Sequence, residues 1–153
     1  MKKLLIASTS TVHGSGYLEY LLDALITHFK SVETILFVPY ARPGGMTHEA
    51  YTENVKLAFS KIGKKVIGLH EFDNPKDAIK TAKALFVGGG NTFILVDQLY
   101  KQDLMGELKA AIESGTPYLG TSAGSNICGL TIGSSNDMPI AYPPSFQTLG
   151  VFP

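Results

Sequence analysis

The chain has 153 residues, of which 44% are hydrophobic and 17% charged, and its 13 basic and 13 acidic side chains cancel. This length and composition predict a single globular domain over residues 1–153, with a sizeable hydrophobic core. Because the charges are balanced and form no block of one sign, we expect no nucleic-acid partner. No apolar run approaches the roughly 20 residues of a membrane span, so we expect no membrane partner either.

The cellular compartment is indicated by cysteine usage and by the start of the chain. Cys128 is the only cysteine. It cannot form an internal disulfide, which is typical of a reducing cytosol. Too few apolar residues follow Met1-Lys2-Lys3 for a signal peptide. We therefore expect a cytoplasmic protein whose oligomeric state stays open, a homo-oligomer included.

Short apolar runs alternate with helical patterns along the first half of the chain. The expected strands are Lys3–Ala7, thought to be buried, Thr34–Val38 and Lys65–Leu69. Apolar residues at three- and four-residue spacing predict the helices between them. These helices are Tyr17–Phe29, a helix after the N-cap Thr47 that runs to Ile62, and a short helix after the N-cap Asn74 that runs through Ala82.

The same alternation continues in the second half. Strands are expected at Ala84–Val87 and Thr116–Gly120, and helices at Thr92–Tyr100 and Asp103–Ser114. Strands that alternate with helices of this length form βαβ units, so we predict a three-layer αβα fold with a mainly parallel sheet. The loops at the carboxyl ends of such strands gather on one rim, where ligands bind.

The last part of the chain departs from this pattern. Gly129–Pro153 has no helical period and several prolines, and it ends on the apolar Val151-Phe152-Pro153. Compact domains rarely carry ~25 structureless residues unless the loop is functional or the domain is incomplete. We therefore expect a domain that lacks its C-terminal part and leaves apolar surface uncovered.

One stretch has the pattern of a nucleophile elbow. Gly120-Thr121-Ser122-Ala123-Gly124 fits G-x-S-x-G between a predicted strand and a predicted helix. The elbow is a strained turn that lifts a serine hydroxyl clear of the sheet, so its flanking positions must be small and φ at Ser122 is expected to be positive. The amide of Ala123 would then face the oxyanion of a reacting carbonyl. The alternative is a tight turn with an incidental serine.

A second glycine-rich loop follows the strand at 84–87. Gly88–Asn91 opens a helix, and its glycines let the backbone approach a ligand closely. We expect Gly89 or its neighbour Gly90 to donate a second hydrogen bond to an oxyanion. Nucleotide binding is disfavoured because the loop is not G-x-G-x-x-G and no Walker lysine follows it. A simple tight turn is the alternative.

A serine nucleophile needs a base and an orienting acid. Asp137 follows the serine in chain order and is the candidate carboxylate, although it could equally cap a turn. His13 and His70 are expected on rim loops, so either could be the base. His28 and His48 are expected on exposed helix faces.

Three motifs then suggest a family. Phe86–Phe93, Gly120–Asn126 and Ser135–Ile140, in this order and spacing, resemble peptidase E, the α-aspartyl dipeptidase family of serine peptidases. The resemblance covers the whole chain. It implies a fold related to class I glutamine amidotransferases and a small peptide substrate with an N-terminal aspartate, hydrolysed without a metal or other cofactor.

The resemblance also implies roles for individual residues. Ser122 matches the nucleophile and Asp137 its acidic partner. Gly89, Gly90 and Ala123 match the oxyanion hole, and Asn91 is implied to bind substrate.

The chain departs from the family pattern in two respects. The family's catalytic histidine lies in an Asn-Pro-His segment just beyond the point that corresponds to Gly150–Pro153, and so does the arginine for the substrate aspartate. A smaller departure is Thr121, where many members of the family have a bulkier aromatic residue. One hypothesis is therefore an aspartyl dipeptidase fold present as a fragment that is nearly inactive alone. The alternatives are a natural short form that acts as a binding or interaction module, and a cyanophycinase-like peptidase.

Overall fold

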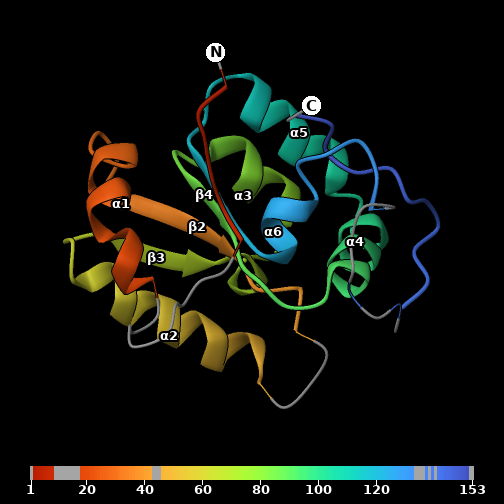
Figure 1. Cartoon of the computed structure of the whole chain (residues 1–153), viewed down its shortest axis with the longest axis horizontal. Helices are drawn as coiled ribbons and strands as arrows, with labels where there is room; N and C mark the ends of the chain where they lie inside the picture. Colours follow the sequence, from red (N-terminus) through yellow and green to blue (C-terminus); the bar gives the residue numbers. More distant parts are fainter. Residues whose placement is uncertain are drawn as a thin grey trace.

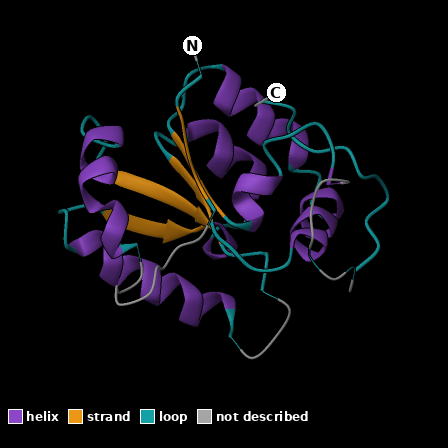
Figure 2. Cartoon of the chain, in the orientation of Figure 1, coloured by secondary structure: helices purple, strands orange, loops and turns teal. Residues whose placement is uncertain are grey.

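The computed structural model shows a central sheet with helices on both of its faces (Figure 1). Figure 2 separates the strands in the middle from the helices around them. The structure describes residues 2–8, 18–42, 46–132, 137, 139 and 141–151.

The sheet has five strands in the order β1-β5-β4-β2-β3, and all four neighbouring pairs are parallel. The strands are β1 (Leu4–Ala7), β2 (Thr34–Val38), β3 (Lys65–Gly68), β4 (Leu85–Val87) and β5 (Tyr118–Thr121). The predicted parallel sheet is therefore confirmed. β5 lies between β1 and β4, so residues that are far apart in sequence meet at its carboxyl end.

The helices lie between the strands in the expected order. They are α1 (Leu22–His28), α2 (His48–Ser60), α3 (Pro75–Thr81), α4 (Thr92–Lys101), α5 (Met105–Glu113) and α6 (Ala123–Asn126). Both predicted N-caps are confirmed. Thr47 Oγ1 accepts a hydrogen bond from the amide of Ala50 at 3.0 Å, and Asn74 Oδ1 accepts one from the amide of Asp77 at 3.2 Å.

Several predicted boundaries differ by one or two residues, and in two places the structure has a 3₁₀ helix that was not predicted. The expected helix 17–29 is instead the 3₁₀ helix η1 (Glu19–Leu21) followed by α1, because Leu18 has a left-handed backbone with φ of 59° and cannot belong to a helix. β3 ends at Gly68, one residue early, and the next three residues form the 3₁₀ helix η2 (Leu69–Glu71).

Alternate residues of the strands build two cores on opposite faces of the sheet. Ile35 and Phe37 of β2 pack with α1 and α2, whereas Leu36 and Val38 pack with α3, α4, α5 and α6. This is the period-2 alternation of a strand that is buried on both faces. The three-layer αβα prediction is confirmed.

β1 differs from its prediction. We expected a buried strand, but among the described strands β1 lies at the edge and pairs only with β5. Leu4 and Leu5 are half-buried, and Ile6 is 36% exposed. An apolar run shows that a strand is present but not how many neighbours it has, which explains the error.

The described residues after α6 form no further helix, yet they complete one of the two cores. The amide of Leu149 donates to the carbonyl of Ile127 at 2.8 Å, and the amide of Val151 donates to the carbonyl of Cys128 at 3.0 Å. Leu149 and Val151 are buried. Val151, expected at an uncovered apolar end, is therefore covered, whereas Phe152 and Pro153 lie outside the described residues. No described helix is long and apolar enough to cross a membrane.

Candidate active site

Ser122 occupies a strained turn directly after β5. Its backbone has φ of 51° and ψ of −110°, so the predicted positive φ is confirmed. A non-glycine residue in this region is uncommon and is held there by its surroundings. The Ser122 amide donates to the carbonyl of Ala7 at 2.9 Å, and its own carbonyl accepts from the amides of Ser125 and Asn126. The residue is only half-buried, so a small molecule can reach it.

The glycines that flank Ser122 are required by close packing. A Cβ at Gly120 would lie 2.5 Å from the carbonyl oxygen of Gly124, and a Cβ at Gly124 would run into the carbonyl oxygen of Val87. Side chains at either position would push α6 away from β4 and β5. The predicted requirement for small residues on both sides of the serine is confirmed.

Hydrogen bonds behind the turn hold it in place. The buried hydroxyl of Tyr118 donates to the carbonyl of Gly124 at 2.6 Å. The hydroxyl of Ser125 lies 2.5 Å from the carbonyl of Ala7 and 2.7 Å from that of Gly120, which ties α6 to β1 and β5. Burial raises the pKa of the nearby Cys128 thiol to about 11, so this cysteine is uncharged and unreactive at neutral pH.

The glycine-rich loop Gly88–Asn91 lies against this turn. The Cβ of Ser122 would be only 3.1 Å from a Cβ placed on Gly89. The loop is fixed from its other side, because the Tyr51 hydroxyl donates to the Gly89 carbonyl at 3.2 Å. Gly90 has φ of 146°, and a side chain there would meet the carbonyl of Ala41. The structure therefore brings together Ser122, Gly89 and Gly90, and Ala123 follows as the first residue of α6.

Asn91 has a structural contact of its own. Its Oδ1 accepts hydrogen bonds from the amides of Phe93 and Ile94, at 3.0 and 3.2 Å, and so caps α4. First-turn amides have no acceptor within the helix, so such a cap stabilises the start of α4. A role for Asn91 in substrate binding stays a prediction.

Asp137 is held at the start of the same helix. Its Oδ2 accepts from the Thr92 amide at 2.8 Å and from the Thr92 hydroxyl at 2.5 Å. The side-chain amide of Asn126, in α6, donates to the same Thr92 hydroxyl at 3.0 Å. A carboxylate here is favoured by the positive end of the helix dipole. Asp137 was expected either to act in catalysis or to cap a turn, and these contacts show it capping the start of a helix. They also place Asp137 beside the 88–91 loop.

The described histidines lie away from Ser122. His70, in η2, follows β3, which is three strands from β5 and so about 14 Å away at the usual strand spacing. Its Nε2 faces Glu49 at 3.9 Å, and its ring packs near that of His48. His28 donates from Nε2 to the carbonyl of Tyr118, at the opposite end of β5 from Ser122.

The expectations for these histidines need correction. His70 lies in a 3₁₀ helix rather than a loop and is not beside Ser122. His28 and His48, expected on exposed faces, are both half-buried. Burial lowers the pKa of each, and for His48 the neighbouring His70 lowers it further. His13 lies outside the described residues.

The topology explains why the site lies on this rim. β2 leads into α2 on one face of the sheet, whereas its neighbour β4 leads into α4 on the other face. Where neighbouring parallel strands send their chains to opposite faces, a crevice opens at their carboxyl ends. β1 and β5 diverge in the same way, since α1 and α6 cover opposite faces. The Gly88–Asn91 loop and Ser122 lie at these two divergences.

Two residues of the site were missed by sequence reasoning. Tyr51 lies in the interior of α2, and its apolar spacing indicates only a core position. Thr92 is a buried helix residue whose hydroxyl bonds both Asp137 and Asn126. A polar residue immediately after the predicted Gly88–Asn91 loop was the one available signal.

The chain is similar to known proteins over nearly its whole length. The family model described as "Peptidase family S51" matches residues 4–153. The chain is 44% identical to a Drosophila melanogaster protein named "Probable alpha-aspartyl dipeptidase", over 99% of this chain and 63% of the relative. It is 41% identical to peptidase E of Haemophilus influenzae, over 100% of this chain and 71% of the relative. It is 43% identical to peptidase E of Streptomyces coelicolor, over 98% of this chain and 60% of the relative.

The fold agrees with solved structures as well. A crystal structure from Listeria monocytogenes superposes with a TM-score of 0.73 at 24% identity, covering 99% of this chain and 75% of that one. At this identity the likeness concerns the fold alone. The chain spans 60% to 71% of the length of the three curated relatives, so their whole activities are not transferred with the match. The matched model and these identities show that the chain belongs to peptidase family S51.

Proposed function

We propose that the chain forms part of a serine-type dipeptidase that hydrolyses dipeptides with an N-terminal aspartate. The observation that carries this proposal is the half-buried Ser122, held at positive φ against the Gly88–Asn91 loop. Such a turn presents a hydroxyl to solvent beside backbone amides, as acyl transfer requires. The names of the relatives support the choice of an aspartyl dipeptide as substrate.

The proposed reaction starts with attack of the Ser122 hydroxyl on the peptide carbonyl. The developing oxyanion accepts hydrogen bonds from the amide of Ala123 and from the Gly89–Gly90 segment. Removing one such donor typically costs about 10²- to 10³-fold in rate. The amine product leaves with a proton, and water then hydrolyses the acyl-serine ester.

The proposed base is none of His28, His48 and His70, because these described histidines lie away from Ser122. We assign it to the Asn-Pro-His segment that the family resemblance implies. Asp137 is the proposed acidic partner that orients that histidine. Its Oδ2 already accepts two hydrogen bonds from Thr92, so the carboxylate is fixed in place before the histidine arrives.

The test is hydrolysis of Asp-Leu by the full product of the reading frame. Ser122→Ala is expected to lower the rate by about 10⁴-fold or more. The matched control is Ser114→Ala, because among the described residues that exposed hydroxyl bonds only the carbonyl of Ala111. A Ser122→Ala enzyme that keeps the parent rate would show that Ser122 is not the nucleophile.

A further inference from the structure

Arg42, which follows β2, has an unusual environment for an arginine. Its Nε is buried and has no hydrogen-bond partner among the described residues, none of which forms an ion pair with its guanidinium group. The guanidinium carbon lies 4.7 Å from the centre of the Tyr51 ring. Burying an N–H of a cation without an acceptor is costly, so natural proteins usually pair it. An acceptor supplied by a ligand would satisfy this arginine.

The backbone next to Arg42 supports the loop of the proposed oxyanion hole. The carbonyl of Ala41 accepts from the amide of Asn91 at 2.7 Å. Gly90 is a glycine because it lies directly on that carbonyl. Tyr51 contacts Arg42 through its ring and Gly89 through its hydroxyl. Arg42 is therefore fixed beside the loop that packs against Ser122.

The distances suit a dipeptide. Arg42 follows β2 and Ser122 follows β5, and β4 alone separates these two strands. At the usual spacing their ends are about 10 Å apart. A two-residue peptide in extended form spans about 7 Å. With the length of an arginine side chain added, a molecule of this size is long enough to contact both residues.

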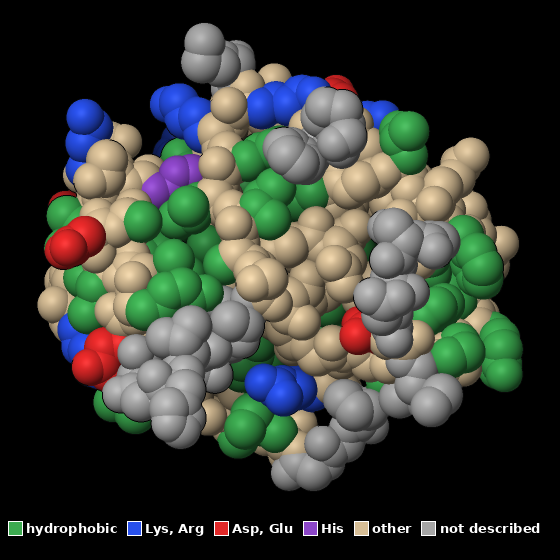
Figure 3. All heavy atoms as spheres, viewed as in Figure 1, with side chains coloured by type: hydrophobic (Ala, Val, Ile, Leu, Met, Phe, Trp, Pro, Cys, Tyr) green, Lys and Arg blue, Asp and Glu red, His purple; other side chains and the backbone are tan. Residues whose placement is uncertain are grey.

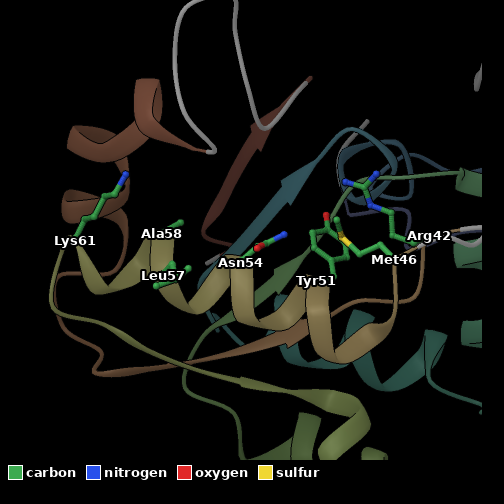
Figure 4. Close-up of a pocket in the computed structure, with 7 residues that line it drawn as sticks. All are labelled: Arg42, Met46, Tyr51, Asn54, Leu57, Ala58 and Lys61. Carbon is green, nitrogen blue, oxygen red and sulfur yellow. The ribbon is translucent and has the colours of Figure 1, made fainter.

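The space around the guanidinium group favours an anion. A pocket of about 270 Å³ runs along α2, and it has two cationic side chains and no acidic one among its described lining residues. Figure 4 shows Arg42 and Lys61 at opposite ends of this pocket, with the Arg42 guanidinium beside Tyr51. The lining residues are Arg42, Met46, Tyr51, Asn54, Leu57, Ala58 and Lys61. On the face shown in Figure 3, most blue side chains lie along the upper edge and most red ones at the left side.

We propose that Arg42 binds a carboxylate of the dipeptide substrate and is a specificity-determining residue of the Ser122 site. The planar guanidinium group matches a carboxylate with two parallel hydrogen bonds. The bound carboxylate accepts a hydrogen bond from the buried Nε–H while the Tyr51 ring orients the arginine. This inference rests on the proposed function, since it takes the ligand to be an aspartyl dipeptide. Such a substrate has two carboxylates, one on the aspartate side chain and one at its C-terminus.

Binding rather than turnover tests the proposal. All variants contain Ser122→Ala, so that no ligand is consumed, and Asp-Leu is titrated by NMR or calorimetry. Arg42→Gln is expected to weaken Asp-Leu binding by about 10- to 100-fold. Arg42→Lys keeps the charge but loses the two-pronged geometry, so an intermediate loss is expected. Lys61→Gln, the matched change at the far end of the pocket, is expected to alter binding less than about twofold.

Two further ligands identify which carboxylate Arg42 binds. Asn-Leu lacks the side-chain carboxylate, and Asp-Leu amide lacks the C-terminal one. The ligand whose binding Arg42→Gln leaves unchanged is the one that lacks the carboxylate bound by Arg42. Equal Asp-Leu affinities for the parent and a folded Arg42→Gln variant would overturn the proposal. So would equal losses in Arg42→Gln and Lys61→Gln, or the absence of Asp-Leu binding to the parent.

The outcome is separable from that of the proposed hydrolysis. If Ser122 proves not to be the nucleophile but Arg42→Gln still loses Asp-Leu binding, the Arg42 carboxylate site is supported and the hydrolysis mechanism is wrong. If hydrolysis depends on Ser122 but Asp-Leu binding does not depend on Arg42, the hydrolysis mechanism is supported and the Arg42 carboxylate site is wrong. Circular dichroism and the thermal midpoint show that each variant is folded.

Discussion

The carboxylate of Asp137 accepts two hydrogen bonds from Thr92, one from its backbone amide at 2.8 Å and one from its hydroxyl at 2.5 Å. The two residues are 45 positions apart, so this contact brings a distant part of the chain to the start of α4. The same hydroxyl accepts a hydrogen bond from Asn126, so α6 is connected to this point as well. Asp137 is therefore a structural residue of the rim in addition to its proposed catalytic role.

We predict a strong energetic coupling between Asp137 and Thr92. Asp137→Ala leaves two Thr92 donors without their acceptor and is expected to lower the free energy of unfolding by about 1–3 kcal/mol. Combined with Thr92→Val in a double-mutant cycle, the coupling should be about 1 kcal/mol or more. Urea unfolding measures both quantities. Thr92→Ser keeps the hydroxyl and serves as the control, and additive single effects would contradict the prediction.

The glycines of the elbow are predicted to tolerate no side chain. Gly120→Ala and Gly124→Ala place a methyl group against backbone atoms that cannot move freely, so we expect losses of about 2 kcal/mol or more, or failure to fold. The control is Gly106→Ala in α5, where nothing lies within 4 Å of the new methyl group. That change should be neutral or stabilising by up to about 1 kcal/mol. Thermal unfolding compares the three variants, and a stable Gly124→Ala protein would refute the packing argument.

His28 is predicted to make stability depend on pH. Burial lowers its pKa in the folded protein below the value of about 6.5 in the unfolded chain. Its contribution is therefore fully present above that unfolded pKa and is lost as the pH falls, because the unfolded chain then binds more protons.

The matched variant is His28→Gln, which keeps a donor for the Tyr118 carbonyl. Between about pH 7.5 and pH 5, the parent should lose more unfolding free energy than this variant. Urea unfolding at several pH values measures the difference. Parallel pH profiles of the two proteins would show that His28 is not linked to folding.

A polypeptide of residues 1–153 alone is predicted to hydrolyse Asp-Leu very slowly. The reason is the position of the described histidines, since none of His28, His48 and His70 lies beside Ser122 and a serine without a base is a weak nucleophile. The oxyanion donors remain, so a residual rate of about 10³- to 10⁴-fold over water is expected. Ser122→Ala should change this residual rate little.

The same substitution should abolish activity in a version extended through an Asn-Pro-His segment. Comparing both lengths, with and without Ser122→Ala, decides the matter. Fast turnover by residues 1–153 that disappears with His13→Ala or His70→Ala would make that histidine the base. An inactive extended version that still binds Asp-Leu would favour the binding-module alternative.

Local features of this protein could be predicted because they depend on neighbouring residues. Alternating apolar runs placed all five strands to within about two residues. Helix capping by Thr47 follows from a side chain and an amide three positions apart. The positive φ of Ser122 follows from the same local logic, since the strand, the turn and the two small glycines are contiguous in the chain.

Only the tertiary structure decided which segments meet. An apolar run does not specify its neighbours, so the strand order and the edge position of β1 could not be predicted. Nor could the contact between Asp137 and Thr92, or the position of the Arg42 guanidinium group over the Tyr51 ring. These depend on residues brought together by the packing of helices on both faces of the sheet. Such contacts stabilise the fold through residues that are far apart along the chain, and a local sequence pattern does not predict which of these residues meet.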